Sequence, residues 1–264
     1  KSDTRSMIIY PVASCTNELI RIVSKYAFVC YQKAVDLNAK GVNNLIKEAY
    51  RGEQWIGGMF PPGENRIKTQ LCFKQGKPTI LLVLRMHNTA NTIQMKEECR
   101  NLFGLGKHSM HVTDAHVDTF RVASSILNEN SVHFLNHGIG DPEAKNLLLR
   151  YFDAVPNDQR HNFCITSSMI LDLYGIRRAM DVDYLHPEVL DLKKKGIEPH
   201  AGKWLTFYPH ESESIIFDPR LHFFFNGFKC ASLAVMVEMK KRRNLPKDNQ
   251  DIKLVAKKIK QLTN

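Results

Sequence analysis

Segments with the hydrophobic periodicity of strands alternate along this sequence with segments that have the periodicity of helices, and no other feature constrains the fold as strongly. In the first half, apolar residues that alternate or run together predict strands at residues 7–12, 27–37, 69–73, 79–86, 111–113 and 132–135. Apolar residues at helical spacing predict helices at residues 17–26, 39–50, 93–103 and 115–127. An all-α fold is excluded, and we expect an α/β or α+β class.

The length of 264 residues allows one large domain or two modest ones. Residues 142–155 predict a connecting helix, and the polar stretch at 156–161 is typical of a linker. We therefore expect an α/β domain over residues 1–150, which would bind an acceptor or a partner. A second domain over residues 151–264 would carry the chemistry.

The composition indicates a folded protein of a reducing compartment. With 43% hydrophobic and 24% charged residues, the chain resembles neither disordered nor low-complexity proteins. No apolar run reaches the ~18 residues of a membrane span, and residues 1–30 hold no apolar signal-peptide core. The cysteines are scattered and form no C-x-x-C pair. We expect a soluble, cytoplasmic protein without a membrane span.

The charge balance favours anionic partners. Lys and Arg number 37 against 27 Asp and Glu, a net charge of +10. Nucleic acid, phosphorylated small molecules and acidic membrane surfaces are all compatible with this charge. Much of the excess lies near the C-terminus, at residues 240–243 and 247 and at the lysines of 253–260. A solvated helix face is the alternative explanation of such a run.

A paired acidic motif stands out in the second half. Residues 163–166 predict a short buried strand, and a Ser167-Ser168 turn and a short helix follow it. Residues 179–185 predict the next strand, which carries Asp181 and Asp183. Residues two apart on a strand project from the same face, so these carboxylates are expected to lie side by side.

Two neighbouring carboxylates repel each other unless a positive charge lies between them, and a divalent cation such as Mg²⁺ or Mn²⁺ meets this need. Asp181 and Asp183 are therefore candidate metal ligands. The Ser167-Ser168 turn lies between a strand and a helix, where free backbone N–H groups can hold a phosphate. This order of elements can bring the phosphates of a nucleotide to a metal.

Residues 163–185 resemble the signature of the nucleotidyltransferase fold. That signature joins an apolar strand ending in Gly-Ser or Gly-Gly to an Asp-x-Asp or Asp-x-Glu pair after a short gap. The corresponding runs here are F-C-I-T-S-S at 163–168, Y-G-I-R at 174–177 and D-V-D-Y-L at 181–185. The form with Tyr-Gly-x-Arg is similar to domains of surface-polysaccharide synthesis, some of them glycosyltransferases. The resemblance covers residues 163–260 and implies a mixed sheet with flanking helices.

The resemblance also implies roles for individual residues. Asp181 and Asp183 would be catalytic metal ligands, and Asp218 is the nearest candidate for the family's third carboxylate. The expected phosphate-binding residues are Ser167, Ser168, Arg177, Lys229 and Lys247. Two departures from the family are visible: Ser167 replaces a glycine, and Pro219 directly follows Asp218.

Without a third carboxylate, one metal on Asp181 and Asp183 still suffices to hold the diphosphate that leaves a nucleotide sugar. The sequence therefore favours a metal-dependent glycosyltransferase that moves a sugar from a nucleotide sugar to a glycan acceptor. The first alternative is a nucleotidyltransferase that moves a nucleoside monophosphate to a sugar phosphate, an RNA end or a small molecule. The second is a non-catalytic nucleic-acid-binding module that uses the basic C-terminal helix.

Overall fold

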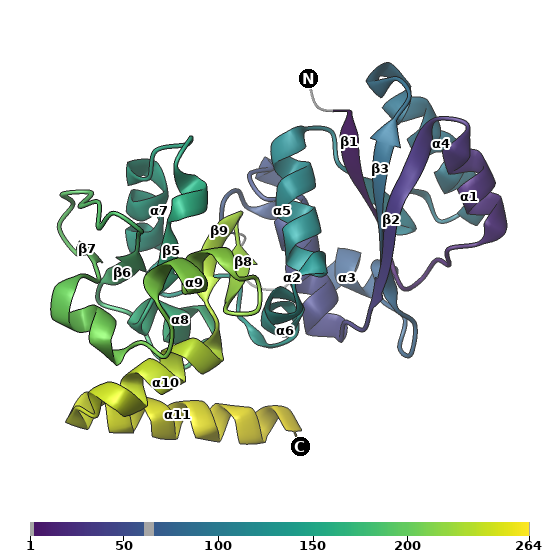
Figure 1. The fold of residues 1–264 in the computed structure, drawn as a ribbon. Helices are drawn as coiled ribbons and strands as arrows, with labels where there is room; N and C mark the ends of the chain where they lie inside the picture. Colours follow the sequence, from purple (N-terminus) through teal and green to yellow (C-terminus); the bar gives the residue numbers. More distant parts are fainter. Residues whose placement is uncertain (1–2, 61–65, 264) are drawn as a thin grey trace. The chain divides into compact units, whose positions relative to one another are not determined.

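The computed structural model describes residues 3–60 and 66–263 (Figure 1). Helices flank two separate sheets, so the expected α+β class is confirmed. The chain divides into two compact units, Lys1–Leu127 and Asn128–Asn264, which we call the N-terminal unit and the C-terminal unit. No helix within the described ranges combines the length and the apolar character that crossing a membrane requires.

In the described part of the N-terminal unit, an antiparallel sheet has the strand order β2-β3-β1-β4. Its strands are β1 (Thr4–Ile9), β2 (Ala27–Val35), β3 (Thr79–Met86) and β4 (Met110–Val112). The α-helices of this unit are α1 (Asn17–Ser24), α2 (Ala39–Ala49), α3 (Arg66–Cys72), α4 (Thr92–Phe103) and α5 (His116–Leu127).

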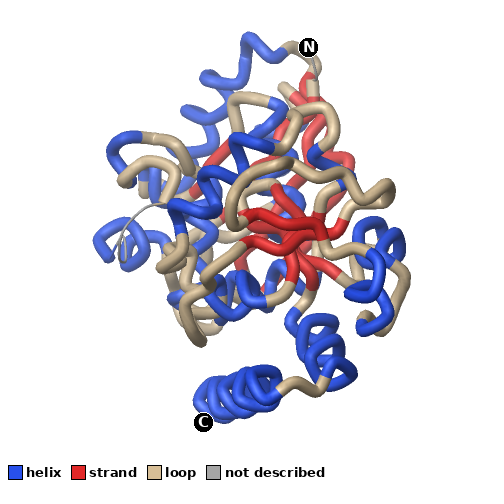
Figure 2. The backbone as a smooth tube through the Cα atoms, turned by 90° about the vertical axis from the view of Figure 1, so that its left-hand side faces the viewer, coloured by secondary structure: helices blue, strands red, loops and turns tan. Residues whose placement is uncertain are grey.

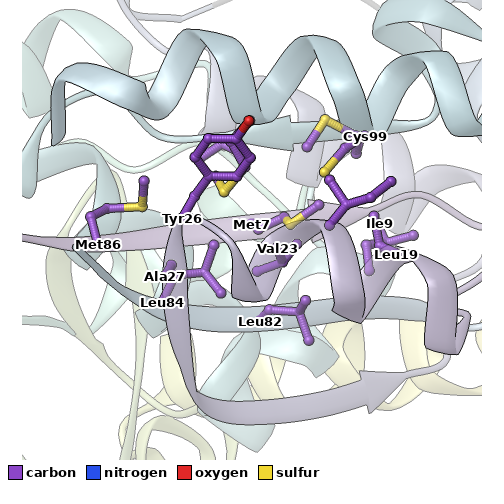
Figure 3. Packing of buried hydrophobic residues seen from close by; sticks show 14 of the residues in the cluster. Met7, Ile9, Leu19, Val23, Tyr26, Ala27, Leu82, Leu84, Met86 and Cys99 are labelled. Atoms are coloured by element: carbon purple, nitrogen blue, oxygen red, sulfur yellow. The ribbon is translucent and has the colours of Figure 1, made fainter. Parts of the chain in front are cut away.

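The two faces of this sheet pack against different helices. Met7 and Ile9 of β1 lie in a hydrophobic cluster with α1 and α4, to which α4 contributes Cys99 (Figure 3). Ser6 alternates with them along β1, as the period of two in a strand requires. The hydroxyl of Ser6 donates to the carbonyl of Thr119 on α5 at 3.1 Å. Helices therefore cover both faces.

The strand predicted at 69–73 is wrong, because this segment belongs to the helix α3. Lys68 and Cys72, four residues apart, are buried, whereas Ile67 and Leu71 are exposed. Gln70, between them, is exposed, although on a strand it would share a face with Lys68 and Cys72, so the burial follows the spacing of a helix. The apolar stretch at 69–73 is too short for the sequence alone to distinguish the spacing of a helix from that of a strand.

The strand predicted at 132–135 is also wrong, because α6 (Glu129–His137) spans it. Ser131, Phe134 and Leu135 are buried, which is helical spacing. The side chain of Asn128 accepts a hydrogen bond from the backbone N–H of Ser131 at 2.9 Å and caps the helix.

In the described part of the C-terminal unit, a mixed sheet has the strand order β7-β6-β5-β9-β8. Its strands are β5 (Cys164–Thr166), β6 (Val182–Leu185), β7 (Ile197–Pro199), β8 (His222–Phe225) and β9 (Phe228–Ala231). β6 is antiparallel to β5 and parallel to β7. The remaining α-helices are α7 (Lys145–Ala154), α8 (Ser168–Leu173), α9 (Ser212–Phe217), α10 (Leu233–Arg243) and α11 (Pro246–Thr263).

The units divide before α6, whereas the sequence placed the domain boundary at 150. Side-chain contacts explain this division. The amide of Asn128 donates to the backbone carbonyls of Pro219 and His222 at 2.8 and 3.1 Å. The ring of Phe134 on α6 stacks on that of Phe223 on β8, with centroids 4.6 Å apart. These hydrogen bonds and the stacked rings hold α6 against the C-terminal sheet.

The last two helices form a pair. Asn244 ends α10 in the left-handed conformation, with φ +52°, and α11 begins two residues later (Figure 2). α11 packs against α10. This pairing places acidic residues of α11 beside basic residues of α10.

Candidate functional site

The site begins where β5 ends and the chain turns into α8. Ser167 has φ +59° and ψ −132°, a conformation that a Cβ atom disfavours. Glycine, which the nucleotidyltransferase signature has at this position, adopts it without strain. Strained residues of this kind cost on the order of 1–3 kcal/mol each and cluster at functional sites.

Two residues hold the segment that leads from α8 to β6. The carboxylate of Asp172 accepts hydrogen bonds from the backbone N–H groups of Glu143, Ala144 and Ala179. Gly175 has φ +63°, and a Cβ there would lie 2.5 Å from the side chain of Ile139. A residue with a Cβ atom would therefore be strained at this φ and would require Ile139 or the turn to shift.

The structure brings the serine turn and both carboxylates of the Asp-x-Asp motif into one cavity of about 370 Å³. The hydroxyl of Ser168 donates to Oδ1 of Asp181 at 2.9 Å. Thr166, at the end of β5, lies in register with Asp183 on β6. The turn and the acidic pair are thus neighbours, which is the arrangement on which the metal and phosphate predictions depend.

A chain of hydrogen-bonding groups runs from Asp183 into the protein. Nε2 of His200 lies 3.3 Å from Oδ2 of Asp183, and Nδ1 of His200 lies 2.6 Å from the hydroxyl of Tyr208. The Tyr208 hydroxyl donates to Oγ1 of Thr166 at 3.0 Å. His200, Tyr208 and Thr166 are all buried, so this chain fixes the orientation of the carboxylate.

These contacts keep Asp183 ionised. Burial raises the pKa of its carboxyl, but hydrogen bonds from His200 and Ser167 and the charge of Arg243 outweigh burial, and the pKa lies below its usual value. A carboxylate that stays negative in a half-enclosed cavity is suited to bind a cation.

Basic side chains line the same cavity. Nε and Nη2 of Arg177 bond to the two oxygens of Asp251 on α11 at 2.6 and 2.8 Å. These hydrogen bonds raise the pKa of Arg177 above its usual value. Arg177 was predicted as a phosphate ligand, and the structure places it at the cavity with Asp251 as its anchor.

Lys240 and Arg243 of α10 also line the cavity and were not predicted. Nζ of Lys240, only 2% exposed, lies 3.3 Å from Asp248 and 2.8 Å from Asp251. Arg243 bonds to both oxygens of Asp248 at 2.6 and 2.9 Å. With Arg177, three cations face two carboxylates, so this network keeps one positive charge in excess beside the cavity.

Lys247 lines the cavity, but two other predicted residues do not. Lys229 lies on β9, and its ammonium donates to the backbone carbonyl of His161 at 2.7 Å. Asp218 ends α9 and forms an ion pair with Arg220 at 2.6 Å. That hydrogen-bonded pair lowers the pKa of Asp218 to about 2. Neither residue is placed to serve the acidic pair.

The structure adds a carboxylate that the sequence did not single out. Glu198 on β7 pairs in register with Asp183 and lines the cavity. Neighbours in register on adjacent strands share a face of the sheet, which explains its position. Because β7 has only three residues and no alternating apolar pattern, Glu198 could not be predicted from the sequence.

Within residues 3–60 and 66–263, no three His, Cys, Asp or Glu side chains are grouped as a metal site. The donors in the cavity nevertheless fit Mg²⁺ or Mn²⁺ by their chemistry, because carboxylate oxygens are hard ligands. Mg²⁺ is usually held by one or two carboxylates together with substrate phosphates rather than by a complete protein cage. Asp181 and Asp183 match that requirement.

Comparisons of the chain with protein-family models, with curated proteins and with solved structures gave no match. The resemblance to nucleotidyltransferases therefore depends on the residues described above.

Proposed function

We propose that the C-terminal unit is a nucleotidyltransferase that binds a nucleoside triphosphate together with Mg²⁺ or Mn²⁺. The observation that carries this proposal is the cavity itself, which joins Asp181 and Asp183 to the Ser167-Ser168 turn and to four basic side chains. Acidic residues next to cations suit a metal–triphosphate complex, in which both kinds of charge are present.

Each group has a distinct task in this proposal. Asp181 and Asp183 hold the cation, oriented by Ser168 and His200 respectively. When bound, the cation neutralises charge on the phosphate oxygens. Arg177, together with the other basic side chains of the cavity, binds the phosphates and stabilises the charge that develops as pyrophosphate leaves.

The transfer breaks the bond between the α-phosphorus and the oxygen that bridges it to the β-phosphate. An acceptor oxygen, either a hydroxyl of RNA or a phosphate oxygen of a sugar phosphate, bonds to the α-phosphorus, and the proton of a hydroxyl acceptor passes to solvent, so the products are a nucleotidylated acceptor and pyrophosphate. The position of Glu198 beside Asp183 favours this reaction over sugar transfer, because a third carboxylate can assist the activation of the acceptor.

Sugar transfer is the second candidate, and one observation favours it. Within the described ranges, Glu198 does not form a group of three metal ligands with Asp181 and Asp183. Two carboxylates are enough to hold a cation on the diphosphate of a nucleotide sugar. This reaction would release a nucleoside diphosphate instead of pyrophosphate.

The test is to incubate the full chain with each nucleoside triphosphate, sugar-phosphate and RNA acceptors, and Mg²⁺ or Mn²⁺. We expect pyrophosphate release that Asp181→Asn and Asp183→Asn each lower by about 100-fold or more. Asp218→Asn is the matched control, because this aspartate lies outside the cavity, and it should keep full activity.

Release of a nucleoside diphosphate from nucleotide sugars would replace the first candidate by the second. Salt-dependent binding of nucleic acid, without any metal-dependent binding of nucleotides, would reject both and favour the binding module.

A further inference from the structure

Trp204 brings an aromatic ring into a cavity that is lined mainly by charged and polar side chains. It lies in the short 3-10 helix Gly202–Phe207 that follows β7. The side chain is 36% exposed, although an indole gains from burial. An exposed aromatic ring on the wall of a cavity is available to a ligand.

The surroundings of the indole are specific. Its ring lies nearly parallel to that of His200, at 14°, with centroids 5.7 Å apart. Two cations also lie near the ring: Cζ of Arg243 is 5.6 Å and Nζ of Lys203 is 5.5 Å from its centroid. A flat apolar surface is thus combined with positive charge, and an aromatic ligand that carries anionic groups meets both.

The same residues connect this ring to the acidic pair. His200 stacks on Trp204 and holds Asp183 through Nε2, and Arg243 lies near both the indole and the carboxylates of the cavity. If the phosphates of a ligand are bound at Asp183, only the imidazole ring of His200 separates that carboxylate from the indole of Trp204. Charged side chains are enough to bind the phosphates of a nucleotide, whereas its base requires an aromatic surface on which to stack.

We propose that Trp204 is the stacking platform for the base of the bound nucleotide, an inference that depends on the proposed function of the same cavity. Stacking accepts every base, because each base presents a π-face. The platform therefore adds affinity for nucleotides over other polyphosphates and fixes the base while the phosphates lie among the basic side chains.

The chain offers a direct optical test, because it has only two tryptophans, Trp55 and Trp204. Trp55 lies in the N-terminal unit, in the 3-10 helix Gln54–Ile56. In the Trp55→Phe variant of the full chain, all tryptophan fluorescence comes from Trp204. We expect ATP with Mg²⁺ to quench this fluorescence on binding, and tripolyphosphate with Mg²⁺, which has no base, to bind without quenching.

Calorimetry on Trp204→Ala provides the second measurement. We expect its affinity for ATP to fall by about 10-fold or more, because base stacking is lost. Its affinity for tripolyphosphate should stay within about two-fold, which also shows that the cavity is intact. Trp204→Phe keeps an aromatic surface and should recover most of the ATP affinity.

The outcomes separate the two proposals. If ATP binds by calorimetry without quenching Trp204, and Trp204→Ala binds ATP as the wild type does, the platform is rejected and the proposed function stands. If neither ATP nor any other nucleoside triphosphate binds with metal, both are rejected.

Discussion

At the scale of single residues, the backbone at Ser167 opposes the preference of its own side chain. Its φ of +59° places the backbone in a region that glycine occupies freely but that a Cβ atom disfavours. Ser168, the next residue, begins α8 and is not among the residues with positive φ. Two adjacent serines thus have opposite backbone requirements, which makes them matched probes of strain in the turn.

We predict that Ser167→Gly is more stable than Ser167→Ala by about 1–2 kcal/mol in the free energy of unfolding. Both variants lose the hydroxyl, so their difference isolates the Cβ atom. The order should reverse at Ser168, where glycine is expected to be less stable than alanine by about 0.5–1 kcal/mol, because helices disfavour glycine. Urea unfolding of the four variants measures these differences. If glycine and alanine had the same order of stability at both positions, the predicted strain at Ser167 would be contradicted.

At the scale of elements, buried charges join α10 to α11. Lys240, Asp248 and Asp251 are each at most 3% exposed, and Arg177 and Arg243 complete the network. Ion pairs this deeply buried contribute little net stability compared with apolar packing, but removing one partner is strongly destabilising. The network therefore fixes the basic side chains of the cavity in position.

We predict that Asp251→Asn lowers the free energy of unfolding by about 3 kcal/mol at neutral pH, because Lys240 and Arg177 lose a buried partner. Burial raises the pKa of Asp251, but Arg177 and Lys240 outweigh burial and lower it below its usual value. Its stabilising contribution is therefore fully present above the unfolded carboxyl pKa of about 3.9 and is lost as the pH falls through the lower folded value.

The difference between wild type and Asp251→Asn should accordingly be constant above about pH 5 and shrink below about pH 4. Urea unfolding across this range measures it. Asp218→Asn serves as the control, since its partner Arg220 is 86% exposed and little change is expected. A difference that grows in acid would show that Asp251 does not act as an ionised partner.

The same network shows what the sequence can and cannot predict. The helices predicted at 39–50 and 93–103 are confirmed as α2 and α4, because their apolar spacing is local. Residues 240–243 looked like a solvated helix face, yet Lys240 is buried, because its partners come from the next helix. Asp218 was the nearest candidate for a third carboxylate, which the family usually has on a later strand, but it follows the helix α9 instead. Contacts between elements carry no local signal.

At the scale of the whole molecule, the division into units depends on aromatic packing rather than on the polar stretch at 156–161. Phe134 of α6 stacks on Phe223 of β8, and Phe152 of α7 stacks on Phe228 of β9, with centroids 4.2 Å apart. Both helices precede the boundary expected at 150 or overlap it. Each therefore supplies part of the core of the C-terminal unit.

We predict that a fragment of residues 128–264 unfolds cooperatively on its own, whereas a fragment of residues 151–264 does not. The shorter fragment loses α6 and most of α7, and with them Phe134 and the hydrogen bonds of Asn128 to the segment around β8. Loss of a single buried Phe typically costs about 3–5 kcal/mol, a large share of the stability of a domain of this size. Circular dichroism during thermal unfolding compares the two fragments. Cooperative unfolding of 151–264 would place the boundary within α7, near residue 150. If neither fragment unfolded cooperatively, the C-terminal unit would require the rest of the chain to fold.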